Sequence, residues 1–442
     1  MLIGFQLIEK RFDVVVVGAG ILGVCIGYLL SRTFRGKILV LEREDMPAVH
    51  TSSRNTGVIH RPFYIDPDKK KLSAASAQKS YFLWLELARK FGLPWNPAGT
   101  LEIATTEEDV KALDRYGKWA ALNGMKQDEF AIMDYMDLKN YDDSLNGYGA
   151  ILSKTDTSVS FGNFTRKIME LAMEEGIQFI PDFAVTRIDE DGDAVNITGV
   201  RGDDPVLITA NFLFNAAGGE SLRLAHQLGL AGKYAVLHFR GDYWTLGDSF
   251  KTAVRHNLYS VPRHMKFPFL DPHLIIRHDG SMEIGPNAAL VSGPYAYGEH
   301  VSRLALAGKI VERPVYPKFK LISSPEFISL VRSEWKSSRS KEHMAARVRR
   351  FLPSLEDSHL DGRGISGVRN SLVDNNGFVA EAVIEKGSSS IHILNYNSPG
   401  ATGAPAFAAH IIKLVSAGGF MNLDKRKTDS DHDIWADLAG DL

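Results

Sequence analysis

The first forty residues alternate apolar runs with glycine-rich breaks, in the order of a strand, a helix and a second strand. Residues 12–17 form a Val-rich run that is typical of a parallel strand buried on both faces. Residues 21–31 predict a helix and residues 37–42 the next strand. This unit predicts a doubly wound sheet at the start of the chain.

Later segments add a second kind of pattern. Helical spacing of apolar residues predicts helices at 73–91, 107–123 and 161–175. Residues 100–104 predict a short strand, and 179–189, 195–200 and 206–208 a small antiparallel group. The apolar run at 211–219 ends in a glycine pair and predicts a return to the first sheet. From 236 to 287, strand-like runs alternate with aromatic and Pro-rich turns, which indicates a separate antiparallel sheet.

Composition narrows the class of protein. At 442 residues the chain exceeds what one hydrophobic core usually serves, so at least two packed units are expected. The 51 Lys and Arg nearly cancel the 53 Asp and Glu, which argues against a nucleic-acid partner and favours a small molecule. Cys25 is the only cysteine, so an intrachain disulfide is excluded and a cytoplasmic protein is expected. Glycines interrupt the apolar run 14–30, so no membrane span is predicted, while peripheral attachment stays open.

A glycine motif joins the first strand to the first helix. Gly18, Gly20 and Gly23 form Gly-x-Gly-x-x-Gly, and Glu42 closes the next strand. The glycines permit a tight turn, backbone approach to a pyrophosphate and close helix packing, while Glu42 would hold the ribose hydroxyls. The motif serves FAD and NAD equally. Its place at the start of the chain and the small, polar loop at 48–60 favour FAD, with a nicotinamide dehydrogenase as the alternative.

That loop carries a specific resemblance. The run Asn55-Thr-Gly-Val-Ile-His60, with Tyr64, resembles the flavin-edge motif of the L-2-hydroxyglutarate oxidase/dehydrogenase family, within the D-amino-acid-oxidase-like FAD-dependent oxidoreductases. The similarity spans about residues 12–415. Further matches in order are Phe239-Arg-Gly-Asp-Tyr243, Pro268-Phe-Leu-Asp-Pro-His-Leu274, Asp279-Gly-Ser281, Gly285-Pro-Asn-Ala288, Gly367-Val-Arg369 and Asn397-Ser-Pro-Gly-Ala-Thr402.

The resemblance implies an extended FAD across the first domain. Residues 398–402 would open a helix beneath the pyrimidine edge of the flavin, where the positive helix end stabilises negative charge on the reduced ring. The expected cofactor-binding residues are Gly18, Gly20, Gly23, Glu42, Arg43, Ser53, Arg54, Asn55, Thr56, Gly57, Val185, Ala217, Gly218, Gly367, Gly400, Ala401 and Thr402.

The fold class expected from these features is α/β, with a Rossmann-like FAD-binding domain interleaved with an α+β substrate domain built on an antiparallel sheet. The FAD-binding domain is expected to be discontinuous, comprising residues 1–90, 150–232 and 345–425. The substrate domain comprises residues 91–149 and 233–344. Residues 426–442 form a charged tail that is expected to be frayed.

The implied reaction, oxidation of a 2-hydroxy acid, requires a base for the hydroxyl proton, a clamp for the carboxylate and an α-hydrogen aimed at flavin N5. Arg369 is the expected carboxylate anchor because a guanidinium binds a carboxylate through two parallel hydrogen bonds; the alternative is an arginine that braces the domain junction. His60 and His273 both fall where the family retains histidine, and either is a candidate base or an interface histidine. The expected substrate-binding residues are Arg61, Tyr64, Arg240, Tyr243, Tyr259 and Asn370.

Several positions depart from the family pattern. Ser53-Arg54 replaces Gly-His, Arg61-Pro62 replaces a small pair, Asn370-Ser371 stands where the family has Ala-Gln, and residues 290–298 replace a basic stretch. We therefore expect altered substrate contacts. Arg54 and Arg61 are candidates for new anion contacts, to a second acidic group or to a phosphate or phosphonate.

The lead function is FAD-dependent oxidation of a small acidic 2-hydroxy acid to the 2-oxo acid, with L-2-hydroxyglutarate as the lead substrate. The alternatives are oxidation of an amine or amino acid on the same scaffold, and a flavin-binding protein without turnover. Oxygen or a quinone is the expected electron acceptor. The sequence shows no residue pattern with metal-ligand spacing, so no metal site is predicted.

Overall fold

The computed structural model describes residues 10–250, 254–263, 267, 271–298 and 301–423. The expected frayed tail at 426–442 and the first three residues of the 268–274 motif lie outside these ranges.

The first unit is an eight-stranded sheet of order β10-β11-β12-β1-β2-β9, with β23 beside β12 and β22 beside β23. β1 pairs in parallel with β2 and β12, which confirms the expected return of the chain to the first sheet. β12 also pairs with β11 in the expected antiparallel group. The strands are β1 (Lys10–Val17), β2 (Ile38–Leu41), β9 (Gln178–Ile180), β10 (Phe183–Asp191), β11 (Ala194–Arg201), β12 (Asp204–Asn215), β22 (Ile384–Lys386) and β23 (Ser390–Ile393).

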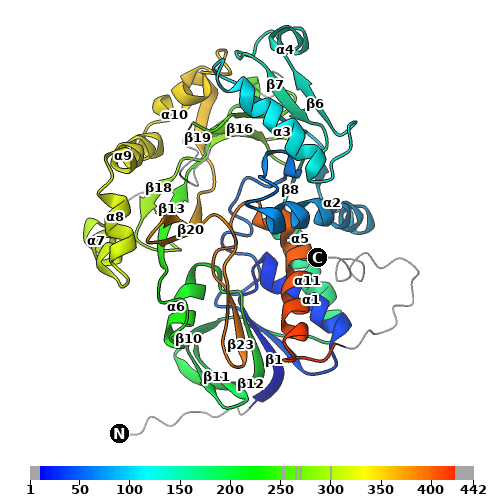
Figure 1. Cartoon of the computed structure of the whole chain (residues 1–442), viewed down its shortest axis with the longest axis vertical. Helices are drawn as coiled ribbons and strands as arrows, with labels where there is room; N and C mark the ends of the chain where they lie inside the picture. Colours follow the sequence, from blue (N-terminus) through cyan, green and yellow to red (C-terminus); the bar gives the residue numbers. More distant parts are fainter. Residues whose placement is uncertain (1–9, 251–253, 264–266, 268–270, 299–300, 424–442) are drawn as a thin grey trace.

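Both faces of β1 are buried, as its unbroken Val run predicts. Val14 and Val16 belong to the core under the helices, whereas Val15 and Val17 belong to the core on the opposite face, because successive side chains of a strand alternate. The helices of the first core, grouped at the lower right of Figure 1, confirm three expected helices and extend the one at 401–408. They are α1 (Ile21–Thr33), α2 (Lys71–Phe91), α5 (Phe161–Glu174) and α11 (Gly400–Ala417).

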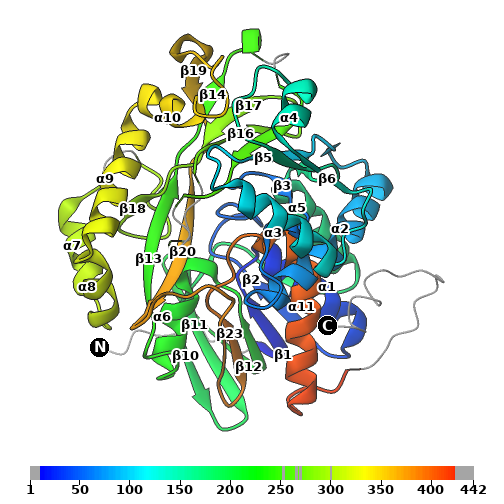
Figure 2. The ribbon, with the colours of Figure 1, turned by 45° about the horizontal axis from the view of Figure 1, so that its top comes forward.

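The second unit contains an eight-stranded sheet of order β19-β14-β17-β16-β15-β5-β7-β6 and a four-stranded sheet of order β18-β13-β20-β21. The antiparallel pairs predominate, as expected, and β5 and β15 are parallel. Figure 2 shows β13 and β20 running between the two larger sheets. The strands are β5 (Thr100–Ile103), β6 (Phe130–Met133), β7 (Ala150–Ser153), β13 (Ala235–Gly241), β14 (Trp244–Leu246), β15 (Asn257–Ser260), β16 (His273–Ile276), β17 (Met282–Gly285), β18 (Ala289–Val291), β19 (Leu360–Arg363), β20 (Gly367–Asp374) and β21 (Gly377–Phe378).

Sheet membership divides residues 345–425, which were expected to form one block of the FAD-binding domain. β22 and β23 join the first sheet, whereas β19 and β20 pair with β14 and β13 of the second unit. The expected block therefore contributes strands to both units, because its strands pair with partners that are distant in the sequence. The other expected domain boundaries stay a proposal.

A small sheet of β3 (Val58–Ile59), β8 (Thr157–Val159) and β4 (Trp95–Asn96) brings distant parts of the chain together. β3 and β8 are antiparallel, with Ile59 opposite Thr157. The residue that follows β3 therefore lies beside the residue that precedes β8. These two residues are His60 and Asp156.

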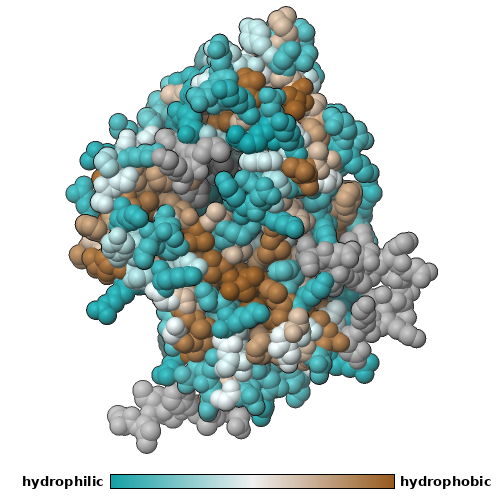
Figure 3. All heavy atoms as spheres, viewed as in Figure 1, coloured by the Kyte–Doolittle hydropathy of each residue, from teal (hydrophilic) through white to brown (hydrophobic). Residues whose placement is uncertain are grey.

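Residues 303–348, which were not assigned elements from the sequence, form four helices against the second unit. α7, α8 and the segment between them expose apolar side chains, which are Leu304, Val311, Val315, Tyr316 and Phe319. Hydrophobic surface lies at the left edge of Figure 3, on the side where Figure 1 shows these helices. In the part of the chain that the structure describes, no helix is both long and apolar enough to cross a membrane. The remaining helices are α3 (Val110–Leu122), α4 (Tyr135–Tyr141), α6 (Ser221–Gln227), α7 (Arg303–Val311), α8 (Tyr316–Ile322), α9 (Pro325–Arg339) and α10 (Lys341–Val348).

Candidate functional site

Two adjoining cavities of about 360 and 280 Å³ form a trough that begins at the carboxyl ends of β1, β2 and β12. This edge is where parallel sheets bind nucleotides. The first cavity contains the expected residues Gly18, Gly20, Glu42, Arg43, Val185, Ala217 and Gly218. The second contains Gly20, Arg54, Asn55, Thr56, His60, Gly218, Tyr243, Tyr259, His273, Gly367, Arg369, Asn370, Gly400, Ala401 and Thr402.

The glycine motif is required by packing at two positions. Gly18 has a φ of +101°, and a Cβ there would lie 2.6 Å from the Ala216 carbonyl oxygen. A Cβ at Gly23 would lie 1.9 Å from the Gly18 carbonyl oxygen, so Gly23 lies behind the trough and lets α1 approach β1. The N-terminus of α1 opens toward the first cavity, where a helix end attracts phosphate.

Glu42 lines the first cavity from the end of β2. Its Oε2 accepts a hydrogen bond from Ala19 N at 2.7 Å, and its Oε1 accepts one from Glu44 N at 3.1 Å. Burial raises the pKa of this carboxyl, while the backbone N–H groups oppose the rise. An acidic group, a glycine floor and a helix N-terminus in one trough fit the adenosine diphosphate half of a dinucleotide.

The loop after β2 places its serines differently from the expectation. Ser53 Oγ donates to the Ala48 carbonyl and is not among the residues of either cavity, whereas Ser52 lines both and its Oγ accepts from Ile21 N at 2.9 Å. Gly57 also lies outside both cavities. Its φ is +70°, and a Cβ there would lie 2.7 Å from the Val159 carbonyl oxygen, so Gly57 serves the turn rather than the cofactor directly.

The first turn of α11 borders the second cavity at Gly400, Ala401 and Thr402. Pro399 precedes this turn and has no side-chain acceptor, so no side chain caps the first backbone N–H groups of the helix. Thr402 also ties the helix to β3, because its Oγ1 accepts a hydrogen bond from His60 N at 3.3 Å. This contact fixes His60 beside the positive end of a helix.

His60 forms a buried pair with Asp156, a residue that the sequence reasoning missed. His60 Nδ1 lies 2.8 Å from Asp156 Oδ2, and Asp156 Oδ1 accepts from Arg61 N at 2.9 Å and from Ser153 Oγ at 2.5 Å. The carboxylate therefore fixes Nδ1 as the donor, which leaves Nε2 as an acceptor. Nε2 lies 3.4 Å from the Tyr259 hydroxyl.

His273 also contacts Tyr259. The two rings stack with centroids 3.9 Å apart. His273 Nδ1 lies 3.2 Å from the Asp271 carbonyl oxygen, so Nδ1 is the protonated nitrogen. Among the described residues, Nε2 of His273 has no hydrogen-bond partner. Burial lowers the pKa of this imidazole to about 3, and it is therefore neutral at physiological pH.

Arg369 lines the second cavity from β20. Burial lowers the pKa of its guanidinium, and the Tyr243 and Tyr64 phenols oppose this effect. Tyr243 lines the cavity, and burial raises its pKa to about 12. Tyr64 instead lies behind the wall, with its ring edge to face with His60 at 5.8 Å.

Asn370 lines both cavities from β20. Its Oδ1 accepts a hydrogen bond from His238 Nδ1 at 2.7 Å. Burial lowers the pKa of His238 to about 4, so this ring is neutral and holds the Asn370 amide without adding charge.

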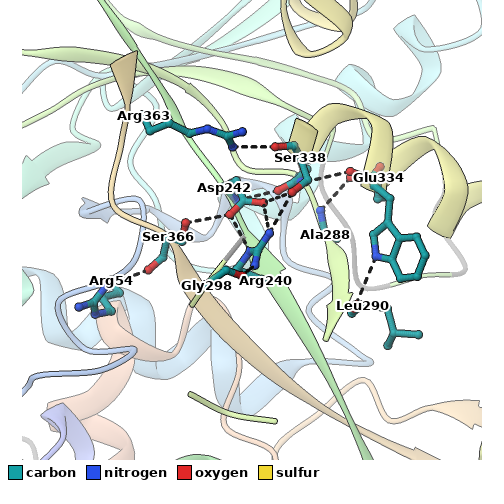
Figure 4. Close-up of polar contacts among 12 residues, drawn as sticks. Arg54, Arg240, Asp242, Ala288, Leu290, Gly298, Glu334, Ser338, Arg363 and Ser366 are labelled. Carbon is teal, nitrogen blue, oxygen red and sulfur yellow. Dashed lines mark hydrogen bonds and ion pairs between the residues drawn. The ribbon is translucent and has the colours of Figure 1, made fainter. Parts of the chain in front are cut away.

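Two of the expected substrate-binding arginines face away from the trough, which corrects the expectation for both. Arg61 is 0% exposed, and its guanidinium donates to both oxygens of Glu129 at 2.9 and 3.0 Å. Arg240 pairs with Asp242 at 2.8 Å and donates to Ser338 Oγ and the Gly298 carbonyl (Figure 4). Each guanidinium is therefore paired with a carboxylate of the protein, Arg61 with Glu129, 68 positions away, and Arg240 with Asp242, two positions away.

Other contributors also escaped sequence reasoning. Pro294 and Tyr295 reach the first cavity from the second unit. Asp156 is 96 positions from His60, so no local spacing connects them. The signals that could have found these residues are the polar Thr155-Asp156 step and the aromatic Tyr-x-Tyr run at 295–297.

Comparisons with known proteins identify relatives along nearly the whole chain. The family described as FAD dependent oxidoreductase matches residues 13–414. The mitochondrial L-2-hydroxyglutarate dehydrogenase of Caenorhabditis briggsae is 29% identical over 418 residues, which cover 91% of this chain and 92% of the relative. The L-2-hydroxyglutarate dehydrogenase of Escherichia coli (strain K12) is 26% identical over 414 residues, which cover 91% and 93%.

Solved structures of similar fold include the dithionite-reduced L-alpha-glycerophosphate oxidase of Mycoplasma pneumoniae with FAD bound. Its TM-score is 0.70 at 18% identity, covering 95% of this chain and 97% of that one. Glycine oxidase from Geobacillus kaustophilus has a TM-score of 0.68 at 15% identity, covering 96% and 97%. At these identities the likeness establishes the fold. Together with the family match over residues 13–414, it confirms that this chain is an enzyme of the FAD dependent oxidoreductase family.

Proposed function

We propose that this enzyme oxidises a small acidic 2-hydroxy acid to the 2-oxo acid, with L-2-hydroxyglutarate as the lead substrate. The observation that carries the proposal is His60, which borders the same cavity as Arg369 and pairs with the buried Asp156. A proton acceptor and a carboxylate anchor in one cavity are what oxidation of a hydroxy acid requires. The names of the two relatives point to the same substrate.

When bound, FAD supplies the acceptor for the hydride that leaves the substrate carbon. His60 Nε2 takes the hydroxyl proton, so that one proton and one hydride leave the alcohol. Asp156, 2.8 Å from Nδ1, stabilises the resulting imidazolium. Tyr259 stays protonated because burial raises its pKa well above the ordinary value, and its hydroxyl can orient the substrate oxygen.

His273 suits a different role from His60. With a pKa lowered to about 3 by burial, it holds a proton poorly at neutral pH. Its ring stacks on Tyr259 with centroids 3.9 Å apart, and so it holds the tyrosine whose hydroxyl lies 3.4 Å from His60 Nε2. We therefore assign the base to His60 and a positioning role to His273.

Arg369 is proposed to hold the 1-carboxylate, since its cavity wall also contains Tyr243, whose phenol stays neutral at physiological pH. Arg54 is a candidate to bind a second acidic group of the substrate, and its guanidinium is held in place by the backbone. Its guanidinium already donates to the carbonyls of Val49 and Ser366 at 3.2 and 3.3 Å.

The test is anaerobic reduction of the purified, FAD-loaded enzyme by a panel of acids, followed by the visible absorbance of the flavin. L-2-Hydroxyglutarate is expected to bleach the flavin, and D-2-hydroxyglutarate and L-glutamate are expected to leave it oxidised. Bleaching by L-glutamate, another amino acid or a phosphate ester, with none by L-2-hydroxyglutarate, would overturn the proposal. Turnover in air compared with turnover on a soluble quinone then identifies the electron acceptor.

A further inference from the structure

A loop of the second unit closes over the first cavity. Residues 293–298 follow β18 and have the sequence Gly-Pro-Tyr-Ala-Tyr-Gly. Pro294 and Tyr295 form part of the cavity wall together with Glu42 and Arg43. The second unit therefore supplies one wall of the first cavity, which is the half of the trough that fits adenosine diphosphate.

Stacked aromatic and cationic groups hold this loop against the first unit. The Arg43 guanidinium lies 4.0 Å from the Tyr295 ring centroid, and the Arg54 guanidinium lies 4.4 Å from the Tyr297 ring centroid. The His50 ring lies 4.5 Å from the Tyr295 ring. The Tyr297 hydroxyl lies 2.9 Å from His50 Nδ1, and Nε2 of the same ring lies 2.8 Å from Glu44 Oε1.

A buried network fixes the end of the loop (Figure 4). Arg240, which is 2% exposed, donates to the Gly298 carbonyl and pairs with Asp242. Ser366 Oγ donates to Asp242 Oδ1 at 2.8 Å, and the Ser366 carbonyl accepts from Arg54 at 3.3 Å. Arg54 in turn lies over Tyr297. The network therefore links Gly298 at the end of the 293–298 loop, Tyr297 in its middle, and Arg54 in the loop that follows β2.

We propose that Tyr295 is a cofactor-binding residue and Tyr297 its positioning residue, so that the 293–298 loop retains the adenosine diphosphate half of FAD from the second unit. Tyr295 borders that half directly, whereas Tyr297 acts through His50 and Arg54. Because the loop belongs to the second unit, release of FAD requires these contacts to open. The inference depends on FAD as the cofactor and is independent of the substrate.

The first experiment measures FAD release from the holoenzyme by the fluorescence of free FAD, together with binding of ADP to the apoprotein. Tyr295→Ala is expected to speed FAD release about tenfold and to weaken ADP binding by a similar factor, since it removes one aromatic contact. Tyr297→Phe keeps the ring but loses the bond to His50, so its effect is expected to be about threefold. Tyr316→Ala is the matched control, because this tyrosine is 62% exposed on α8 and borders neither cavity.

Unchanged FAD release and ADP binding in folded Tyr295→Ala would overturn the inference. If that variant fails to fold, hydrogen exchange of the wild-type apoprotein provides the test. ADP is expected to slow exchange of the amides at 295–298, and exchange that ADP leaves unchanged would overturn the inference. ADP has neither flavin nor substrate, so these outcomes are separate from success or failure of the proposed reaction.

Discussion

Asp156→Asn tests the proposed base by changing one atom of a fully buried side chain. Asp156 Oδ1 faces the backbone N–H of Arg61 and the Ser153 hydroxyl, and Oδ2 faces His60 Nδ1. The asparagine oxygen must take the Oδ1 position, because a backbone N–H can only donate. The amide nitrogen then faces His60 Nδ1 and forces that atom to accept. The proton moves to Nε2, which can no longer take the substrate proton.

The expected fall in the rate of flavin reduction follows from the loss of the general base. Removing a general base typically costs about 10² to 10⁴ in rate, and an Asp-to-Asn change that fixes the wrong histidine tautomer lies near the upper end of this range. We therefore expect the rate of flavin reduction to fall by at least about 10²-fold, or about 2.7 kcal/mol of transition-state stabilisation. FAD content is expected to stay near that of the wild type, because Asp156 is not among the residues that border either cavity.

The assay is anaerobic stopped-flow reduction of the holoenzyme by saturating L-2-hydroxyglutarate. Ser153→Ala is the matched control, since it removes the other side-chain donor to Asp156 and leaves the His60 tautomer intact. A fall of less than about threefold in that variant is expected. A rate for Asp156→Asn within about threefold of the wild type, with FAD bound, would refute the role of His60 as the base.

Three further predictions concern other buried groups. Arg369→Lys keeps the charge but loses two-point binding, so KM for the acid should rise about tenfold or more in steady-state kinetics while FAD stays bound. Arg61→Met should lower the free energy of unfolding by about 2 kcal/mol, measured with urea, because Glu129 loses its partner; an altered substrate KM would contradict the assigned structural role. Burial raises the pKa of Glu102 to about 8, so the folded state holds a proton that the unfolded chain releases at its ordinary value of 4.5, and stability falls as the pH rises between these values. The free energy of unfolding of Glu102→Gln should therefore gain about 4 kcal/mol relative to the wild type as the pH rises from about 5 to about 8.5 in thermal unfolding, and an equal difference at both pH values would count against the raised pKa.

The strand-helix-strand opening was predictable because its signals are local. The Val run of β1 must be buried on both faces, and Gly18 and Gly23 stand where a Cβ would strike the backbone. The positive end of α11 was expected at residues 398–402 from the family resemblance, and the helix begins at Gly400.

The partners of charged side chains were not predictable in this way. Arg61 and Arg240 were expected to bind substrate, yet their charges are satisfied by Glu129 and Asp242 inside the protein. Glu129 lies 68 positions from Arg61, so no local pattern links them. Asp242 lies only two positions from Arg240, yet the motif does not show whether that arginine faces the acid or a cavity. The choice depends on which strands pair, and β20 joins β13 although 126 positions separate Gly241 from its partner Gly367.

By itself, the sequence determined the nucleotide-binding unit, the identity of the cofactor class and the segments that border the trough. Periodicity, glycine positions and helix starts are properties of neighbouring residues, so they can be recognised without knowing which distant parts of the chain are in contact. Only the tertiary structure decided that Asp156 fixes His60, that Tyr295 closes the first cavity and that Arg61 faces away from the second. Each of these outcomes depends on strand register and on the desolvation of charge, which arise when segments far apart in the sequence pack together.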